Sequence, residues 1–257
     1  AGSITSAAAQ LTVTPLLPAV SSAGRITNLS ILTSVASVGD TFTMGFVVGG
    51  GGTSGAKSLL VRSAGPALTA LGVAGVLADP KLELYAGPNQ TGENDNWGTP
   101  SGPGAATAAQ LLAAFAQAGA FLFGNATSLD SAIIANITSP ENTVKVSGVG
   151  NATGTVIAEL YDLTPAASFT TATPRLVNVS VLKNIGALLT VGFYIDGNTA
   201  KRVLVRAVGP TLGDAPFGVP GVVADPRLEL HSPVNGTDTI MGSNDNWGTP
   251  AGLGAAN

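Results

Sequence analysis

Two identical loops hold the residues most suited to chemistry in this sequence. The heptapeptide Asn-Asp-Asn-Trp-Gly-Thr-Pro occupies residues 94–100 and returns unchanged at 244–250. Clustered amide and carboxylate oxygens are ligands that Ca²⁺ accepts, although the spacing is not that of an EF-hand. The calcium interpretation involves both loops, through Asn94, Asp95, Asn96, Asn244, Asp245 and Asn246. The structural alternative is an Asn/Asp turn that directs the following tryptophan into the core.

A third interpretation leaves the loop tryptophans exposed. An indole ring has a broad apolar face and a polar edge, which suits it to stacking against a sugar ring. Trp97 and Trp247 are therefore candidate ligand-binding residues, and polysaccharide is the candidate ligand.

Other patterns that could support catalysis are weak. The sole histidine, His231, stands where the matching segment has Tyr85, so a histidine-dependent mechanism would serve one copy only. The glycine run 49–52 lacks the lysine of a phosphate-binding loop. Asp79 and Glu83 could form a glycosidase pair, but a solvated strand face explains Glu83 better. We expect no enzymatic activity.

Composition restricts the partners. Charged residues make up 10% of the 257 residues, against about 25% in an average globular protein. With 11 basic residues and a net charge of −4, nucleic acid and anionic membrane surfaces are unfavourable partners. The absence of cysteine excludes disulfides and thiolate metal sites.

The location is expected to be extracellular or at the cell surface, without membrane insertion. The most apolar stretch, 105–124, is interrupted by Gln110 and Gln117 and falls short of a spanning helix. The chain has no leader of basic and then apolar residues, so a secreted form would already have lost its signal.

The chain repeats itself with a unit of about 150 residues, which is the size of a domain. Residues 25–32, 57–66, 78–84 and 94–100 return as 175–182, 201–210, 224–230 and 244–250. The first copy continues to about residue 165, whereas nothing in the second copy matches 121–165. Residues 1–15, which end in Leu-Thr-Val-Thr-Pro, align with the last strand of a unit at 151–165.

The phase of the repeat predicts four segments. These are a tail strand of a preceding unit with a linker (1–24), a complete repeat (25–165), an extended linker (166–174) and an incomplete second repeat (175–257).

Most of the sequence predicts short strands between Gly, Pro and Asn turns. Residues 59–61 and 203–205 have no polar face, which indicates central strands buried on both sides. Residues 105–118 predict one helix that ends at Gly119. The expected fold class is therefore all-β, with tandem β-sandwich or jelly-roll-like units and one short helix per unit.

Two arginines lie inside these apolar strands. Arg62 and Arg206 each precede a Gly-Pro pair after an apolar run. A buried guanidinium needs an acceptor, so each is expected to hold a carboxylate or turn carbonyls of its own unit.

An incomplete unit cannot bury its apolar face alone, and an open sheet edge invites another chain. Either the chain belongs to a longer tandem array, or each subunit is completed by its neighbour head to tail. On the second view the partners are copies of the same chain that form a fibre or surface layer by β-strand complementation. The expected assembly residues are Leu11, Val13, Pro15, Trp247 and Leu253.

Seven Asn-X-Ser/Thr sequons are candidate glycosylation sites, and chance supplies several in a chain so rich in these residues. They lie at Asn28, Asn89, Asn125, Asn136, Asn151, Asn178 and Asn235.

Several of these motifs together carry a resemblance. Arg-Ala-Val-Gly-Pro at 206–210, Ala-Asp-Pro-Arg-Leu-Glu-Leu at 224–230, both Asn-Asp-Asn-Trp-Gly loops, Gly-Ala-Phe at 119–121 and Ser-Leu-Asp-Ser-Ala at 128–132 contribute to it. The chain resembles a repeat of very large secreted bacterial surface proteins, a family without an established activity. The resemblance implies an extracellular, modular protein and no particular mechanism.

Overall fold

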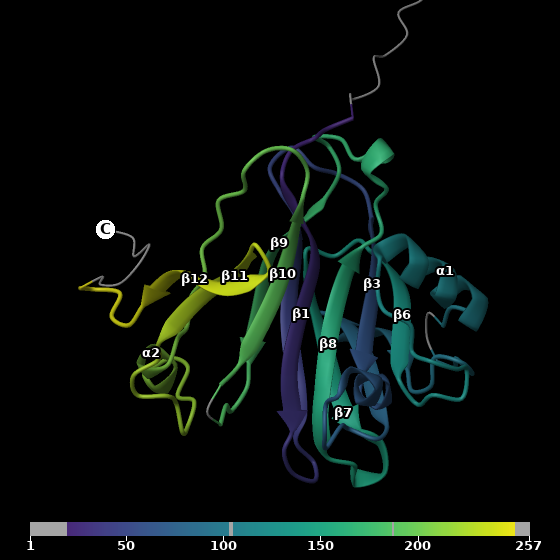
Figure 1. Cartoon of the computed structure of the whole chain (residues 1–257), viewed down its shortest axis with the longest axis horizontal. Coiled ribbons are helices and arrows are strands. Elements are labelled where there is room, and N and C mark those ends of the chain that lie inside the picture. Colours follow the sequence, from purple (N-terminus) through teal and green to yellow (C-terminus); the bar gives the residue numbers. More distant parts are fainter. Residues whose placement is uncertain (1–19, 103–104, 187, 250–257) are drawn as a thin grey trace, which may run out of the picture. The chain divides into compact units, whose positions relative to one another are not determined.

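The computed structural model describes residues 20–102, 105–186 and 188–249 and shows an all-β protein, as predicted. The chain forms two compact units. Of the described residues, unit 1 contains 20–102, 105–182 and 189–200, and unit 2 contains 183–186, 188 and 201–249. Figure 1 shows the strands of unit 1 as long neighbouring arrows.

Unit 1 consists of two five-stranded sheets in which all pairings are antiparallel. The first sheet has the order β10 (Thr190–Asp196), β1 (Arg25–Val35), β8 (Gly154–Asp162), β3 (Lys57–Ala64) and β6 (Ser131–Ile137). The second has the order β5 (Asn89–Asn94), β4 (Pro80–Ala86), β7 (Glu141–Gly148), β2 (Thr41–Gly49) and β9 (Arg175–Leu182).

The two sheets share one apolar core, as in a β-sandwich. Ile31 and Leu160 of the first sheet and Phe42 and Val144 of the second belong to the same buried cluster. Strand residues alternate between the two faces, so Lys145, next to Val144, points away from the core and pairs with Glu83 instead.

A second apolar cluster covers the outer face of the first sheet. Helix α1 (Ala108–Ala118) begins with a capping box between Thr107 and Gln110 and ends at Gly119 in the left-handed region. It buries Leu111 and Phe115 in a cluster that includes Leu60 of β3. Because Leu59 lies in the other cluster, β3 is covered on both faces, as predicted.

Two strands of the second sequence repeat belong to unit 1. In the repeat β9 matches β1, and β10 matches β2 because Gly45-Phe46 returns as Gly192-Phe193. In the structure, however, β10 pairs with β1 and β9 pairs with β2. The two pairings are equivalent: a Cβ on Gly45 would lie 2.9 Å from the Ser180 hydroxyl, and one on Gly192 would lie 3.1 Å from the Ser30 hydroxyl. The first two strands of each repeat therefore pair reciprocally with those of the other, one pair in each sheet. The compact units do not coincide with the sequence repeats.

The segment predicted as the linker 166–174 is packed against unit 1. It begins with the short 3₁₀ helix η3 (Ala166–Ser168), and Phe169 is buried beneath the Arg25 guanidinium, 4.1 Å from its ring centre. Thr170 forms an isolated β-bridge with Val20, and the Ala172 carbonyl accepts from the Ser54 amide. This extended-linker prediction is corrected, because a buried aromatic anchors the segment.

Unit 2 contains helix α2 (Pro210–Gly213) and the antiparallel hairpin β11 (Leu228–Val234) and β12 (Thr237–Asn244). Residues 201–208, the counterpart of β3, form no strand. The sequence did not predict α2, nor the 3₁₀ helices η1 (Pro66–Leu71) and η2 (Val149–Asn151) of unit 1. Every helix of the described residues is too short or too polar to cross a bilayer.

Candidate functional site

The guanidinium of Arg62 on β3 is fully buried in unit 1, with its side chain 0% exposed. Its Nε lies 3.1 Å from Oε2 of Glu159 on β8, and its Nη1 donates to the Phe121 carbonyl at 2.6 Å. The rings of Phe115, Phe121 and Phe123 surround it, with centroids 4.7, 4.4 and 4.1 Å from Cζ. Arg62 thus holds a carboxylate of its own unit, as expected, together with a backbone carbonyl of the 121–123 segment. Arg206, for which the same was expected, is exposed and forms no ion pair among the described residues.

The electrostatics of this pair are dominated by burial. Burial raises the pKa of Glu159, while Arg62 and a hydrogen bond from Tyr161 oppose the shift. The Tyr161 hydroxyl donates to Glu159 Oε1 at 2.8 Å, and burial raises the pKa of that hydroxyl as well. Charge, rings and carbonyl are all directed inward, so the cluster fastens β3, β8 and the 121–123 segment together.

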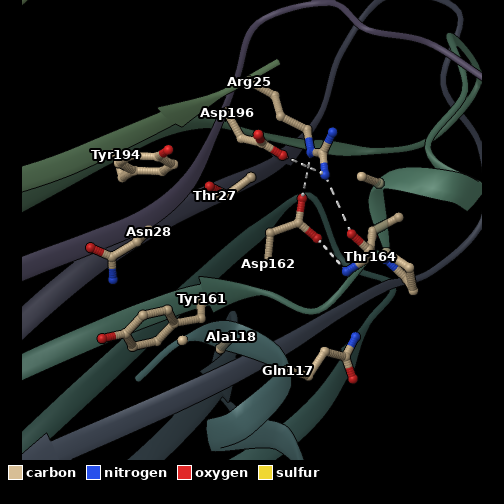
Figure 2. A pocket seen from close by; sticks show the side chains of 13 residues that line it. Arg25, Thr27, Asn28, Gln117, Ala118, Tyr161, Asp162, Thr164, Tyr194 and Asp196 are labelled. Atoms are coloured by element: carbon tan, nitrogen blue, oxygen red, sulfur yellow. Dashed lines mark hydrogen bonds and ion pairs between the residues drawn. The ribbon is translucent and has the colours of Figure 1, made fainter. Parts of the chain in front are cut away.

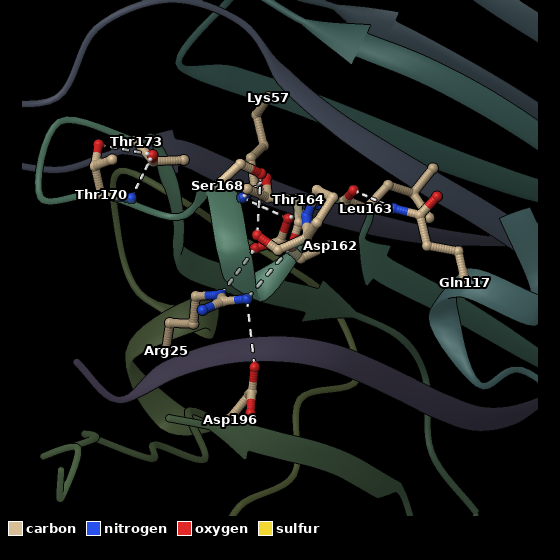
Figure 3. A network of polar contacts seen from close by, with 11 residues as sticks. Arg25, Lys57, Gln117, Asp162, Leu163, Thr164, Ser168, Thr170, Thr173 and Asp196 are labelled. Atoms are coloured by element: carbon tan, nitrogen blue, oxygen red, sulfur yellow. Dashed lines mark hydrogen bonds and ion pairs between the residues drawn. The ribbon is translucent and has the colours of Figure 1, made fainter. Parts of the chain in front are cut away.

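A second buried cluster lies at the end of β8 (Figure 3). Asp162 receives two cations: Lys57 Nζ lies 2.5 Å from Oδ1 and Arg25 Nε lies 3.5 Å from Oδ2. Lys57 also donates to the Thr164 hydroxyl at 2.8 Å. Burial lowers the pKa of Lys57, and the charge of Asp162 acts in the opposite direction. β8 therefore supplies the carboxylates for all three buried cations, through Glu159 and Asp162.

A cavity of about 480 Å³ lies beside this cluster (Figure 2). Its lining includes Asn28, Gln117, Tyr161 and Tyr194. The charged groups at its rim pair with each other, since Arg25 also lies 3.3 Å from Asp196 of β10.

The first Asn-Asp-Asn-Trp-Gly loop has a structural role. Asn94 is fully buried, and its Oδ1 accepts from the Ala132 amide at 2.9 Å. Trp97 is 3% exposed and packs against Phe115 and Phe123, with centroids 5.8 and 6.1 Å away. Trp97 consequently presents no face on which a sugar could stack.

The calcium prediction gains no support from the loop. Asn94 uses its acceptor on the backbone, and in the described part of the chain no group of three or more His, Cys, Asp or Glu side chains is arranged to hold a metal ion. Asp95 faces Asp79, and burial, followed by the charge of Asp95, raises the pKa of Asp79. Asn96 is half-buried. In the second loop, Asn244 is half-buried and Asp245 and Asn246 are exposed.

Sequence reasoning did not single out Arg25, Lys57, Glu159 or Asp162, and it also missed Asp130. Asp130 is fully buried, and its Oδ1 accepts from the Gly65 amide at 2.7 Å, with further bonds from Ala67 and Ser128. Burial raises the pKa of this carboxyl against those hydrogen bonds. The Trp97 amide donates to its carbonyl at 2.9 Å. The only signal was its position in the motif 128–132, which was used for resemblance alone.

The second repeat differs from the first in the exposure of matching residues. Leu60 is 0% exposed and its counterpart Leu204 is 85% exposed. Trp97 is 3% exposed and Trp247 is 93% exposed. The two-sided burial predicted for 203–205 is therefore not present: β6 and β8 flank β3, whereas no strand among the described residues lies beside 203–205.

The glycines show the same contrast. A Cβ on Gly98 would lie 1.8 Å from the Ala126 carbonyl oxygen, whereas a Cβ on Gly248 has open space around it. Another matching pair of glycines is equally crowded in both repeats. A Cβ on Gly65 would lie 2.0 Å from the Leu77 carbonyl oxygen, and a Cβ on Gly209 would lie 2.0 Å from that of Val223. The second repeat therefore forms its local turns without the segment that covers them in the first.

The remaining predicted site residues are the assembly residues and the sequon asparagines. Leu11, Val13, Pro15 and Leu253 lie outside the described residues. Six of the sequon asparagines are exposed, and Asn28 is half-buried with a hydrogen bond to the Leu160 carbonyl. The exposed six are Asn89, Asn125, Asn136, Asn151, Asn178 and Asn235.

The protonation of His231 should affect the stability of the β11–β12 hairpin, because both acidic partners of its ring belong to that hairpin. Its Nδ1 lies 2.9 Å from Asp238 and its Nε2 lies 3.5 Å from Glu229, and the Asp238 hydrogen bond raises the pKa above the usual 6.5. The hairpin should be more stable below pH 6.5, and this increment should disappear as the pH rises through the raised pKa. Because the chain has one histidine, its imidazole NMR signal reports the pKa directly. Asp238→Asn should lower that pKa, and an unchanged pKa would contradict the pairing.

Comparison with known proteins returned no match: no family model, no curated protein and no solved structure is similar to this chain.

Proposed function

We propose that this is an extracellular structural protein whose tandem β-sandwich-like units assemble head to tail into a fibre or surface layer. The mechanism is β-strand complementation, in which strands from outside the second repeat complete it. One observation carries the proposal: positions that form the closed core of the first repeat are exposed in the second, most clearly at Leu204 and Trp247. Burying that apolar surface against added strands favours association.

The strand edges support the same function. Among the described residues, β9 and β10 are each paired on one side only. In the first repeat the counterpart of β9, which is β1, pairs on its other side with β8 over residues 28–35. An open edge with unpaired amides and carbonyls accepts an added strand. β9 therefore offers the place at which a β8-like strand would continue the sheet.

The charge balance is compatible with assembly. A net charge of −4 over 257 residues gives weak mutual repulsion between copies. Exposed apolar side chains in the second repeat, such as Val205 at 47%, add to the surface available for burial.

Gly248→Ala is expected to block assembly without affecting the folding of the isolated chain. The open space around Gly248 means that the isolated chain should fold with an unchanged melting temperature. In a completed second repeat the position would resemble Gly98, where a Cβ collides with a carbonyl at 1.8 Å. The substitution should therefore abolish the concentration-dependent growth in sedimentation coefficient and the filaments in negative-stain micrographs of the wild-type chain.

Gly51→Ala is the matched control, because Gly51 also has open space around it and lies outside both tryptophan loops. It should assemble like the wild type. Assembly of Gly248→Ala at the wild-type concentration, or a wild-type chain that stays monomeric at every concentration, would refute the proposal.

Carbohydrate binding is the alternative function, favoured by the 93% exposure of Trp247. It requires that ring to remain free, whereas assembly requires it to become buried. Polysaccharide that binds the dispersed chain through Trp247 and is not released on assembly would support the alternative.

A further inference from the structure

The cavity beside the Arg25 cluster has a floor of aromatic and amide side chains (Figure 2). The floor is the outer face of the first sheet, where Tyr194 of β10, Asn28 of β1 and Tyr161 of β8 lie side by side on paired strands. The carboxyl-terminal end of α1 and residues 164–166 form the walls. The volume of about 480 Å³ is within the range of small-molecule binding sites.

We propose that this cavity binds a neutral carbohydrate, namely an uncharged sugar unit of an oligosaccharide or polysaccharide chain. The lining belongs entirely to unit 1 and includes neither Trp247 nor any residue of β9. The inference therefore goes beyond the proposed assembly and does not depend on it.

Tyr194 supplies the surface for stacking a sugar ring. The residue is 63% exposed although it lies within a strand. Tyr161, on the same face, is only 8% exposed, and its hydroxyl donates to Glu159 at 2.8 Å. An aromatic ring that is open to solvent beside polar groups suits the apolar face of a sugar. Tyr194 thus provides the stacking surface, and Tyr161 completes the floor beside it.

Two amide side chains next to these rings are oriented by the backbone. Nδ2 of Asn28 donates to the Leu160 carbonyl at 3.4 Å, and Nε2 of Gln117 donates to the Leu163 carbonyl at 2.5 Å. Since each amide nitrogen is used in this way, the amide oxygens can accept hydrogen bonds from a ligand. Sugar hydroxyls are suitable donors.

The charges at the rim favour a neutral ligand. Arg25 pairs with Asp162 and Asp196, and Lys57 pairs with Asp162, so two cations face two carboxylates in this cluster. A charged ligand would have to separate these pairs, whereas a sugar hydroxyl can donate to Asp196 without doing so. The Asp196 side chain is 42% exposed, which leaves room for that contact.

Three residues that line the cavity have less polar counterparts in the matching strand pairing of the second sheet. The β10–β1 and β2–β9 pairings have the same register, with a bulge at the same place. In that register the counterparts of Tyr194, Asp196 and Thr27 are Val47, Gly49 and Val177. Strand pairing therefore does not require an aromatic ring, a carboxylate and a hydroxyl at these positions. A ligand site accounts for their presence together at the cavity.

The test measures binding of oligosaccharides to the full chain in its dispersed form. The probes are neutral gluco-, galacto- and manno-oligosaccharides on an array, with oligouronates of the same length as charged counterparts. Isothermal titration calorimetry then measures the affinity of the best neutral probe. We expect neutral probes to bind more tightly than oligouronates, and to shift the amide NMR signals of residues 26–29 and 192–196.

Tyr194→Val should weaken this binding by about tenfold or more, because the stacking surface is lost. The melting temperature should stay unchanged, since the ring is largely exposed and valine occupies the matching position in β2. Tyr85→Val is the matched control: Tyr85 lies on β4, outside the cavity lining, and its variant should bind like the wild type.

The inference would be overturned by a chain that binds none of the neutral probes, by tighter binding of oligouronates, or by equal affinities of the wild type and Tyr194→Val. Binding that is lost in Trp247→Ala but kept in Tyr194→Val would overturn it and support the carbohydrate-binding alternative. Each of these results leaves the proposed assembly standing, because Gly248→Ala tests that assembly separately.

Discussion

Arg62→Met is expected to lower the free energy of unfolding of unit 1 by about 3–5 kcal/mol, because it leaves Glu159 buried without its cation. Glu159 is 3% exposed and lies in a cluster whose other members are aromatic rings and the Tyr161 hydroxyl. The Phe121 carbonyl loses its donor at the same time. Urea denaturation followed by near-UV circular dichroism measures the change.

The second repeat supplies a matched control for this prediction. Arg206→Met makes the same substitution at the matching position, where the side chain is exposed, and should change the stability of the dispersed chain by at most about 0.5 kcal/mol. Adding Glu159→Leu to Arg62→Met should recover part of the loss, because no buried charge then remains unpaired. Equal effects of the two arginine substitutions would show that the Arg62 cluster does not hold unit 1 together.

Trp97→Ala is expected to cost unit 1 about 3–5 kcal/mol, the range for removing a buried tryptophan from a packed core. Its ring contacts Phe115 and Phe123, so the cavity would open between α1 and the 121–123 segment. The loop backbone would keep its bond from residue 97 to Asp130, and little collapse is expected. Thermal unfolding at one fixed protein concentration reports the loss.

Trp247→Ala should leave the melting temperature of the dispersed chain unchanged, because 93% of that residue is already exposed. A loss comparable to that of Trp97→Ala would mean that Trp247 is buried in the dispersed chain. That outcome would contradict the exposure on which the proposed assembly depends.

Local patterns in the sequence predicted the local elements of the first repeat. The Ala-rich run 105–118 and the stop at Gly119 predicted α1, although the helix begins at Ala108, after the Thr107 cap that was not predicted. The apolar run 59–61 indicated a strand covered on both faces. These features follow from residues close together in the sequence. The repeat also located the strand counterparts of β1 and β4, which are β9 and β11, whereas the expected counterpart of β3 at 201–208 forms no strand.

Long-range pairing could not be derived in the same way. β1 could equally have had strands of the first repeat on both sides. The alternation of apolar and polar residues along β1 does not indicate that β10, from the second repeat, is its neighbour. Phe169 gave no sign that the segment between the repeats is packed, since one aromatic residue between Pro and Thr is also typical of a loop. Asp130 was overlooked because its partners are backbone amides, which have no sequence signature.

At the candidate site, too, local features were predictable from the sequence and long-range contacts were not. The repeat identified Arg62 and Arg206 as equivalent, and an expected acceptor followed from the cost of burying a guanidinium. Which carboxylate accepts was not predictable, because Glu159 is distant in the chain and reaches Arg62 only through the β3–β8 register.

Hydrogen exchange of the backbone amides of residues 201–208 tests the central claim most directly. The dispersed chain should exchange there rapidly, since these residues form no strand, whereas 57–64 of β3 should be protected. On assembly the 201–208 amides should become as protected as those of 57–64, and Gly248→Ala should prevent that change. Ordered assemblies in which 201–208 still exchange rapidly would contradict the claim that a completed second repeat holds the copies together.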